Sequence, residues 1–417
     1  MTLQVDQPTL RRRIFLLVLT DFLWGMGWYF VSFTTTVPAY LRSLGAPTIC
    51  IGVMATTMSA LPMVLPLFGR SVIDRFPHRK IGIIILHLIF ILPYFLIAAM
   101  DMVYAHTAPQ LVILFLLVVL AFSQVILGLI LPVWIDMVAQ IIPQEMHGRY
   151  FGMTSSAFAC GGILGGVGLT ILQQMAGSAV FRRAFFVAGT FFVLAMLAFA
   201  FTPIPESAFV HLPEPSIFTR MRKALSAAHP RTNFGRFVMS YGVQILAISS
   251  VAFLADYASS TRGLHYPRAI FSTINLYQAI GGTVGALILG TLVDRVGPRW
   301  PWIGLTCIIP LLALLMPFGG HFPLLMLCAL LSGLLITHWS VGAPALLELS
   351  PRGDKSGYVA VANMLALPSS VFGPLLIAHL IDGVSYSAGF LLAAIAGILA
   401  LLVALTLSPR AATDNPD

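Results

Sequence analysis

Long apolar segments alternate with short polar breaks along the whole chain. A helix needs about 20 apolar residues to cross a bilayer, where every backbone group must be hydrogen-bonded within the protein. Twelve segments reach this length, so the pattern predicts an all-helical membrane protein. We predict spanning helices over 14–38, 49–72, 81–103, 109–136, 150–174, 184–203, 237–257, 268–291, 300–318, 323–346, 357–381 and 385–408.

The longest polar stretch, 204–236, separates the sixth segment from the seventh. It is rich in proline and in basic residues, which is typical of a linker between membrane bundles. We therefore predict an N-terminal six-helix bundle over 1–203, a cytoplasmic linker over 204–236 and a C-terminal six-helix bundle over 237–417. Within the linker, a short surface helix is expected at 216–228.

Composition agrees with a surface that faces lipid. Of the 417 residues, 58% are hydrophobic and 9% are charged, against roughly 25% charged in soluble domains. The net charge of +8 does not indicate nucleic-acid binding, because the cations lie in the short breaks. The four cysteines show no metal or disulfide spacing, and no nucleotide-binding or hydrolase motif occurs, so we expect neither a cofactor nor an enzyme.

The distribution of lysine and arginine predicts the orientation of the chain. With the N-terminus in the cytoplasm, 18 of the 23 basic residues lie on the cytoplasmic side, as the positive-inside rule requires. The other side then holds only Arg42, Arg182, Arg183, Arg262 and Arg268. We expect both termini to be cytoplasmic, in a monomer located in the bacterial inner membrane.

The two halves of the sequence repeat. Asp-Arg follows the second segment at Asp74 and the eighth at Asp294, 220 residues later. Pro143 and Pro351, after the fourth and tenth segments, each precede a tyrosine by seven residues. Repeats in the same direction predict a two-fold axis along the membrane normal, with a site between the halves.

The two Asp-Arg loops resemble the loop motif of the major facilitator superfamily, which runs Gly-x-x-x-Asp-Arg-x-Gly-Arg-Lys/Arg. The first loop departs from it, with Arg70 and Pro77 at the glycine positions. The resemblance covers residues 10–410 and implies two bundles that transport a solute by alternating access. The matching residues are Asp74, Arg75, Arg79 and Lys80 in the first loop and Gly290, Asp294, Arg295, Gly297 and Arg299 in the second.

The same resemblance implies that these loops act as gates. Asp74 would dock at the start of the eleventh helix, near Gly357, and Asp294 at the start of the fifth, near Gly148. The flanking arginines would pair with Asp136 and Glu348, which holds the cytoplasmic side shut in one state. Alternatively, the charges serve only as topology signals.

Ionisable groups inside the membrane are functional candidates by default. Asp21 shares a helix face with Trp24 and Trp28, at spacings of three and seven residues. A carboxylate beside two indoles can bind a cation or a sugar, or carry a coupling proton. The alternative is a carboxylate at the inner end of the helix that pairs with a nearby arginine.

Further candidates lie on the seventh and tenth helices and on the fourth. His338, with Trp339, is expected near mid-membrane, where a histidine can respond to a proton gradient. Asp256 lies at the outer end of the seventh helix, where it is either a gate or site residue or simply an interfacial carboxylate. By family analogy Gln124 and Gln244 face the cavity, whereas the alternative for each is a polar contact between helices. The same choice applies to Ser32, Thr34, Thr35, Thr36, Asn275, Gln278 and Asn363.

The predicted function is secondary active transport of a small organic solute, coupled to protons. The glycine-rich fifth helix shares Gly152, Gly161 and Gly165 with the antiporter motif of the family, which favours export weakly. The scarcity of charge inside the membrane favours an uncharged or amphipathic solute. The alternatives are an importer of a sugar or metabolite, and a transporter-like receptor or assembly partner. We expect lipid, a solute and protons as the only partners.

Overall fold

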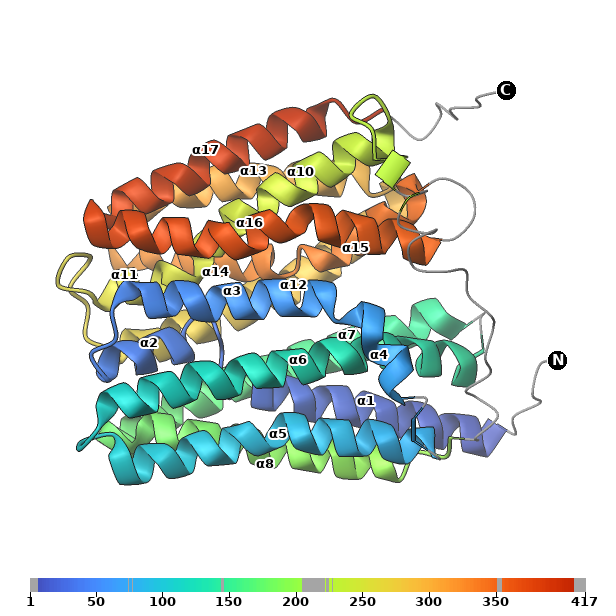
Figure 1. Cartoon of the computed structure of the whole chain (residues 1–417), viewed down its shortest axis with the longest axis horizontal. Coiled ribbons are helices and arrows are strands. Elements are labelled where there is room, and N and C mark those ends of the chain that lie inside the picture. Colours follow the sequence, from blue (N-terminus) through green and yellow to red (C-terminus); the bar gives the residue numbers. More distant parts are fainter. Residues whose placement is uncertain are drawn as a thin grey trace. The chain divides into compact units, whose positions relative to one another are not determined.

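The computed structural model describes residues 7–73, 75–76, 78–143, 146–204, 222, 225–226, 228–350 and 355–408. Every element of this described part is a helix (Figure 1). The first half contains α1 (Gln7–Phe30), α2 (Thr36–Ser43), α3 (Thr48–Val64), α4 (Pro66–Ile73), α5 (Arg79–Tyr104), α6 (Pro109–Ile141), α7 (His147–Ala176), η2 (Gly177–Ala179) and α8 (Val180–Ala200).

The second half repeats this succession after the linker. It contains α10 (Asn233–Ile248), η4 (Ser249–Phe253), α11 (Leu254–Ser259), α12 (Ile270–Val296), α13 (Arg299–Leu315), η5 (Met316–Phe318), α14 (Phe322–Ile336), α15 (Trp339–Leu349), α16 (Lys355–Gly383) and α17 (Tyr386–Leu405). Most of the predicted surface helix at 216–228 lies outside the described residues.

All twelve predicted segments are helical, which confirms the fold class. Ten stretches of the described residues have the length and hydropathy to cross a membrane. One of these, Arg149–Ala200, joins α7 and α8, and the apolar helix Thr48–Val64 is a shorter span, so the count of segments is twelve. The protein is therefore an integral, multi-pass membrane protein.

Four of the spans are interrupted, and here the prediction of continuous helices was wrong. The first span stops at Phe30 and resumes at Thr36. In the gap, the backbone N–H of Thr34 donates to Ser32 Oγ, a local bond that competes with the helix. Pro38 adds to this, because its ring clashes with the carbonyl four residues earlier. In the seventh span, Ser249 and Ser250 donate to carbonyls of the preceding turn and the helix narrows to η4.

The other two interruptions have local causes as well. The second span breaks at Leu65, directly before Pro66, because a proline disfavours helical backbone in the preceding residue. The tenth span breaks at Thr337 and His338, where the Thr337 hydroxyl donates to the Leu334 carbonyl. The offset of 220 residues carries the gap at 31–35 onto 251–255, which overlaps η4. The first and seventh spans are thus interrupted at equivalent places.

The described helices form two compact units. Unit one comprises residues 1–46, 65–212 and 268–279, and unit two comprises 47–64, 213–267 and 280–417. Each unit therefore includes a segment from the other half of the sequence. The two segments are equivalent in the repeat, because the 220-residue offset carries Pro47 onto Pro267. The bundle boundaries at 203 and 237 were predicted from the sequence repeat, and they remain a prediction.

In unit one, α1 packs against α7 and α8, and α5 packs against α6 and α8. The contact of α1 with α7 is made by backbone. A Cβ atom on Gly161 would lie 2.1 Å from the Phe22 carbonyl oxygen, and one on Gly25 would lie 2.1 Å from the Phe158 oxygen. Only glycine permits so close an approach.

In unit two, α3 lies along α16, and α10 packs against α16 and α17. Hydroxyl groups on one face of α3 donate to backbone carbonyls of α16. Thr56 Oγ1 lies 3.1 Å from the Val371 oxygen, and Ser59 Oγ lies 3.1 Å from the Ser370 oxygen. Thr48 donates to the carboxylate of Asp382 at the far end of α16.

Candidate functional site

Asp21 lies on α1, half-buried, in unit one. Its helix packs against α7. Asp21 is thus an ionisable side chain within a membrane span, which makes it a candidate carrier of a proton.

Trp24 lies three residues after Asp21 on α1. Its indole packs among rings of α5 and α8, with centroid distances of 5.4 Å to Phe90 and 4.7 Å to Phe192. Trp28 instead meets Phe33 at 5.6 Å, beside the interruption of the first span. The described contacts of Trp24 are therefore with aromatic rings of unit one, and its side chain is half-buried.

Another histidine within a membrane span, His87 on α5, was not among the residues predicted from the sequence. Its ring lies between two indoles, 5.5 Å from Trp24 and 5.8 Å from Trp134. Its Nδ1 atom lies 2.8 Å from the Ile83 carbonyl oxygen. The same rule that identified His338, an ionisable residue within an apolar segment, identifies His87 as well.

Two glutamines are fully buried with no partner. Gln124 on α6 and Gln244 on α10 are both 0% exposed, and neither amide atom of either residue has a hydrogen-bond partner among the described residues. A buried polar group without a partner costs about 1–3 kcal/mol. Such groups require an explanation, of which a bound molecule is one.

A cluster of polar side chains follows the interruption of the first span in unit one. Thr35 Oγ1 donates to Asn275 Oδ1 at 2.9 Å, and Thr34 Oγ1 donates to Gln278 Oε1 at 2.7 Å. The Asn275 amide in turn donates to the Tyr29 carbonyl at 2.7 Å, which replaces helical bonds lost at the gap. Two interpretations were given for these residues, cavity lining and polar contacts between helices. The hydrogen bonds of these four side chains are polar contacts between helical segments.

In unit two, Asp256 is buried and paired. Its Oδ2 atom accepts a hydrogen bond of 2.7 Å from the hydroxyl of Tyr386 on α17. His338 lies at the interruption between α14 and α15, with Nδ1 3.2 Å from the Leu335 carbonyl oxygen. The sequence predicted one continuous tenth helix around His338, but the helix is interrupted at this residue. The side chain of Trp339 lies outside the described residues.

The first loop motif makes a contact that the sequence did not predict. Lys80 Nζ donates to the carbonyls of Ala200 and Thr202, both at 2.7 Å, so it caps the C-terminus of α8. Arg75 is exposed and Arg79 is half-buried. Asp74 and the side chain of Asp136 lie outside the described residues.

In the second loop motif, Gly297 has φ +77°, a left-handed conformation that favours glycine. A Cβ atom there would lie 3.8 Å from Glu348 Oε1, so this carboxylate is beside the loop. Asp294 and Arg295 are exposed, and Gly290 has open space around it. The guanidinium of Arg299 lies 4.8 Å above the Trp300 ring.

Solved structures with the same fold include several transporters. The nucleoside transporter NupG has a TM-score of 0.71 at 16% identity, covering 94% of this chain and 99% of that chain. The fucose:proton symporter FucP of E. coli has 0.61 at 14%, covering 95% and 98%. The xylose transporter XylE from E. coli has 0.66 at 12%, covering 97% and 98%. No curated protein sequence matches this chain.

The family model of the Major Facilitator Superfamily matches this chain twice, over residues 14–232 and 232–417. The two matches cover nearly the whole sequence and coincide with its internal repeat. Within the described residues, no three metal-ligating side chains come together. The chain belongs to the major facilitator superfamily, and it is a multi-pass membrane protein of the secondary-transporter class.

Proposed function

We propose that this protein moves an uncharged, hydrogen-bonding organic solute by alternating access, and that protons drive the movement. The observation that carries the proposal is the pair of fully buried amides, Gln124 and Gln244, with no partner among the described residues. Each belongs to a different unit. A solute that hydrogen-bonds either amide removes the free-energy cost of leaving that amide unpaired, and this gain favours binding.

The chemistry of an amide limits the class of solute. A glutamine side chain offers two N–H donors and a carbonyl acceptor without any charge. It therefore matches the hydroxyl, amide and ether groups of an uncharged molecule, whereas a polyanion requires a cluster of cations. Nucleosides, fucose and xylose, which are named for the similar structures, are uncharged and rich in such groups.

We assign the coupling proton to Asp21. A carboxyl group inside the membrane is favoured in its neutral form, so it can take up a proton and release it during transport. His338 and Asp256 are the alternative carriers. The glycine pattern of α7 favours export, and the similarity to a proton symporter favours import.

The remaining proposals concern topology and gating. We place the protein in the bacterial inner membrane as a monomer, with both termini in the cytoplasm, on the basis of its basic residues. The loops with Asp74 and Asp294 would stabilise one of the two transport states. We propose no enzymatic activity. A receptor or assembly partner without transport is the alternative function.

The experiment is uptake into proteoliposomes of a mixed panel of sugars, nucleosides and drug-like solutes, measured by mass spectrometry. It is run with the pH gradient in each direction and without one. Gln124→Leu and Gln244→Leu should fold at least as stably as the parent protein but move the solute at least about tenfold more slowly. Gln110→Leu is the matched control, because Gln110 is exposed on the same helix as Gln124.

Each outcome has a defined meaning. Accumulation that follows the gradient and is lost in Asp21→Asn supports proton coupling through Asp21. Uptake that is unchanged in both glutamine variants would contradict the assignment of the solute contacts. If folded, reconstituted protein moves no solute in either direction, the receptor function replaces transport.

A further inference from the structure

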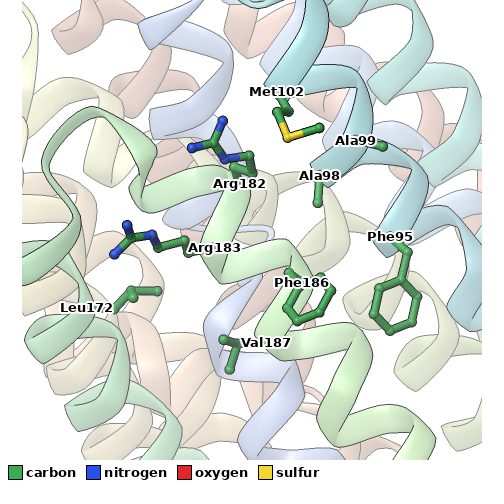
Figure 2. Close-up of a pocket in the computed structure, with 9 residues that line it drawn as sticks. All are labelled: Phe95, Ala98, Ala99, Met102, Leu172, Arg182, Arg183, Phe186 and Val187. Carbon is green, nitrogen blue, oxygen red and sulfur yellow. The ribbon is translucent and has the colours of Figure 1, made fainter.

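A groove opens on the surface of unit one between α5, α7 and α8 (Figure 2). Its volume is about 480 Å³, which falls within the range of roughly 300–1,000 Å³ typical of small-molecule sites. Leu172 contributes from α7. The walls formed by α5 and α8 are apolar, and they consist of Phe95, Ala98, Ala99, Met102, Phe186 and Val187.

The groove is fixed by packing. The ring of Phe95 covers Gly189, where a Cβ atom would lie 2.8 Å from Phe95 Cζ. The same ring meets Phe186 edge to face at 5.5 Å. At the mouth, Met102 is 64% exposed and Phe186 is 57% exposed. The groove is therefore preformed and open to the surroundings of the helices, which are lipid in a membrane protein.

Two arginines, Arg182 and Arg183, stand at this groove in the first turn of α8. Neither makes a hydrogen bond or an ion pair with any other residue in the described ranges. Arg42 and Arg262, two of the other cations predicted for the same side of the membrane, instead donate to backbone carbonyls. The two guanidinium groups are thus available to a ligand.

Their position on the helix is unfavourable unless an anion is present. The N-terminus of a helix carries a partial positive charge, so cations in the first turn are repelled by it. The residue that precedes α8, Ala179, has only a methyl side chain, which cannot cap the first turn of the helix. A phosphate bound by the two arginines would offset this repulsion and accept paired hydrogen bonds from each guanidinium group.

We propose that this groove binds one anionic phospholipid. The phosphate would lie between Arg182 and Arg183, and an acyl chain would lie along the apolar walls between α5 and α8. A free phosphate would use the arginines and leave the walls uncovered. A lipid uses both, because its phosphate bonds the arginines and its acyl chain covers the apolar walls. The site also gives a physical reason for two of the five exceptions to the positive-inside count.

The proposal is tested by lipid retention in native mass spectrometry. The full-length protein is placed in nanodiscs of phosphatidylcholine and phosphatidylglycerol at a ratio of 3:1, with identical acyl chains. The parent protein should retain one phosphatidylglycerol. Arg182→Gln/Arg183→Gln should retain at least about tenfold less, as expected for the loss of charge-assisted bonds. Arg268→Gln is the matched control, because Arg268 is another exposed arginine of unit one.

A second variant tests the acyl chain separately from the phosphate. Ala99→Phe fills the mouth of the groove at an exposed position and leaves both arginines in place. It should reduce retention of the lipid, and glycerophosphate should fail to displace the lipid from the parent protein. Equal retention in the double arginine variant, equal retention in Ala99→Phe, or displacement by glycerophosphate would each overturn the proposal. If the double variant fails to fold, the exposed Arg183→Gln replaces it.

Discussion

The contact between α1 and α7 leads to a prediction about two glycines on one helix. Gly161 and Gly152 both lie on α7, so alanine at either position is chemically the same change. At 161 the added Cβ atom would lie 2.1 Å from the Phe22 carbonyl oxygen of α1. At 152 it would meet nothing within 4 Å. Only the surroundings differ, so the pair isolates the effect of helix packing.

The magnitude follows from the distance. Ordinary contact begins at 3.4 Å, so the Cβ atom at 161 is about 1.3 Å too close. Its neighbours are backbone atoms, which cannot rotate away as a side chain would, so α1 and α7 must separate. Overpacking of this kind typically costs about 1–3 kcal/mol, and the separation also weakens Cα–H···O contacts of about 0.5–1 kcal/mol each. We expect Gly161→Ala to destabilise the protein by roughly 2–4 kcal/mol.

Gly152→Ala should have the opposite sign. Glycine inside a helix is about 0.5–1 kcal/mol less favourable than alanine, and the open space at 152 leaves only this gain. The assay is the midpoint of thermal unfolding in one detergent, with the half-life at a fixed temperature where unfolding is irreversible. Transport by both variants is measured at a temperature where both are folded. Equal midpoints for Gly161→Ala and Gly152→Ala would refute the argument from close packing.

Three further predictions concern stability. Lys80→Met removes the bonds that cap α8 and should lower stability by about 1–3 kcal/mol, while the exposed Arg75→Met should not; equal unfolding midpoints would contradict the cap. Gly297→Ala forces alanine into a left-handed conformation and should cost about 1–2 kcal/mol, in contrast to Gly304→Ala in open space. Asp256→Leu and Tyr386→Phe should show a coupling of about 1 kcal/mol in a double-mutant cycle, and additive effects would exclude their bond.

The spans could be predicted from sequence because the bilayer allows few solutions. A long apolar segment in lipid must be helical, whatever its neighbours are. The interruptions could not be placed with the same rule, because apolar periodicity averages over many residues. They depend on local hydrogen bonds, such as the one from the backbone N–H of Thr34 to the hydroxyl oxygen of Ser32. Hydroxyl residues near Pro38 and Pro66 were visible in the sequence, but their effect on the backbone needs the structure.

The candidate site was predictable to a lesser extent. Polarity inside a span singled out Gln124 and Gln244 as candidates, but the sequence cannot tell a paired amide from an unpaired one. Trp24 lies three residues after Asp21 on one helix, but its indole packs against aromatic rings of α5 and α8. Such a contact joins residues that are distant in sequence, so no pattern within one helix predicts it.

The basic residues show how one signal can carry two roles. In the sequence, Arg13, Lys80 and Arg236 count toward topology, but in the structure each donates to carbonyls at the end of a helix. Arg13 bonds the Ile141 and Pro203 oxygens, and Arg236 bonds the Thr406 oxygen. Removing any of them would damage folding whether or not the loops act as gates. A test of gating should therefore begin at Asp294, which is exposed, and compare the accessibility of cysteine labels in Asp294→Asn and the parent protein. Unchanged labelling in a variant that folds normally would mean that the loop charges determine only the topology of the chain and do not act as a gate.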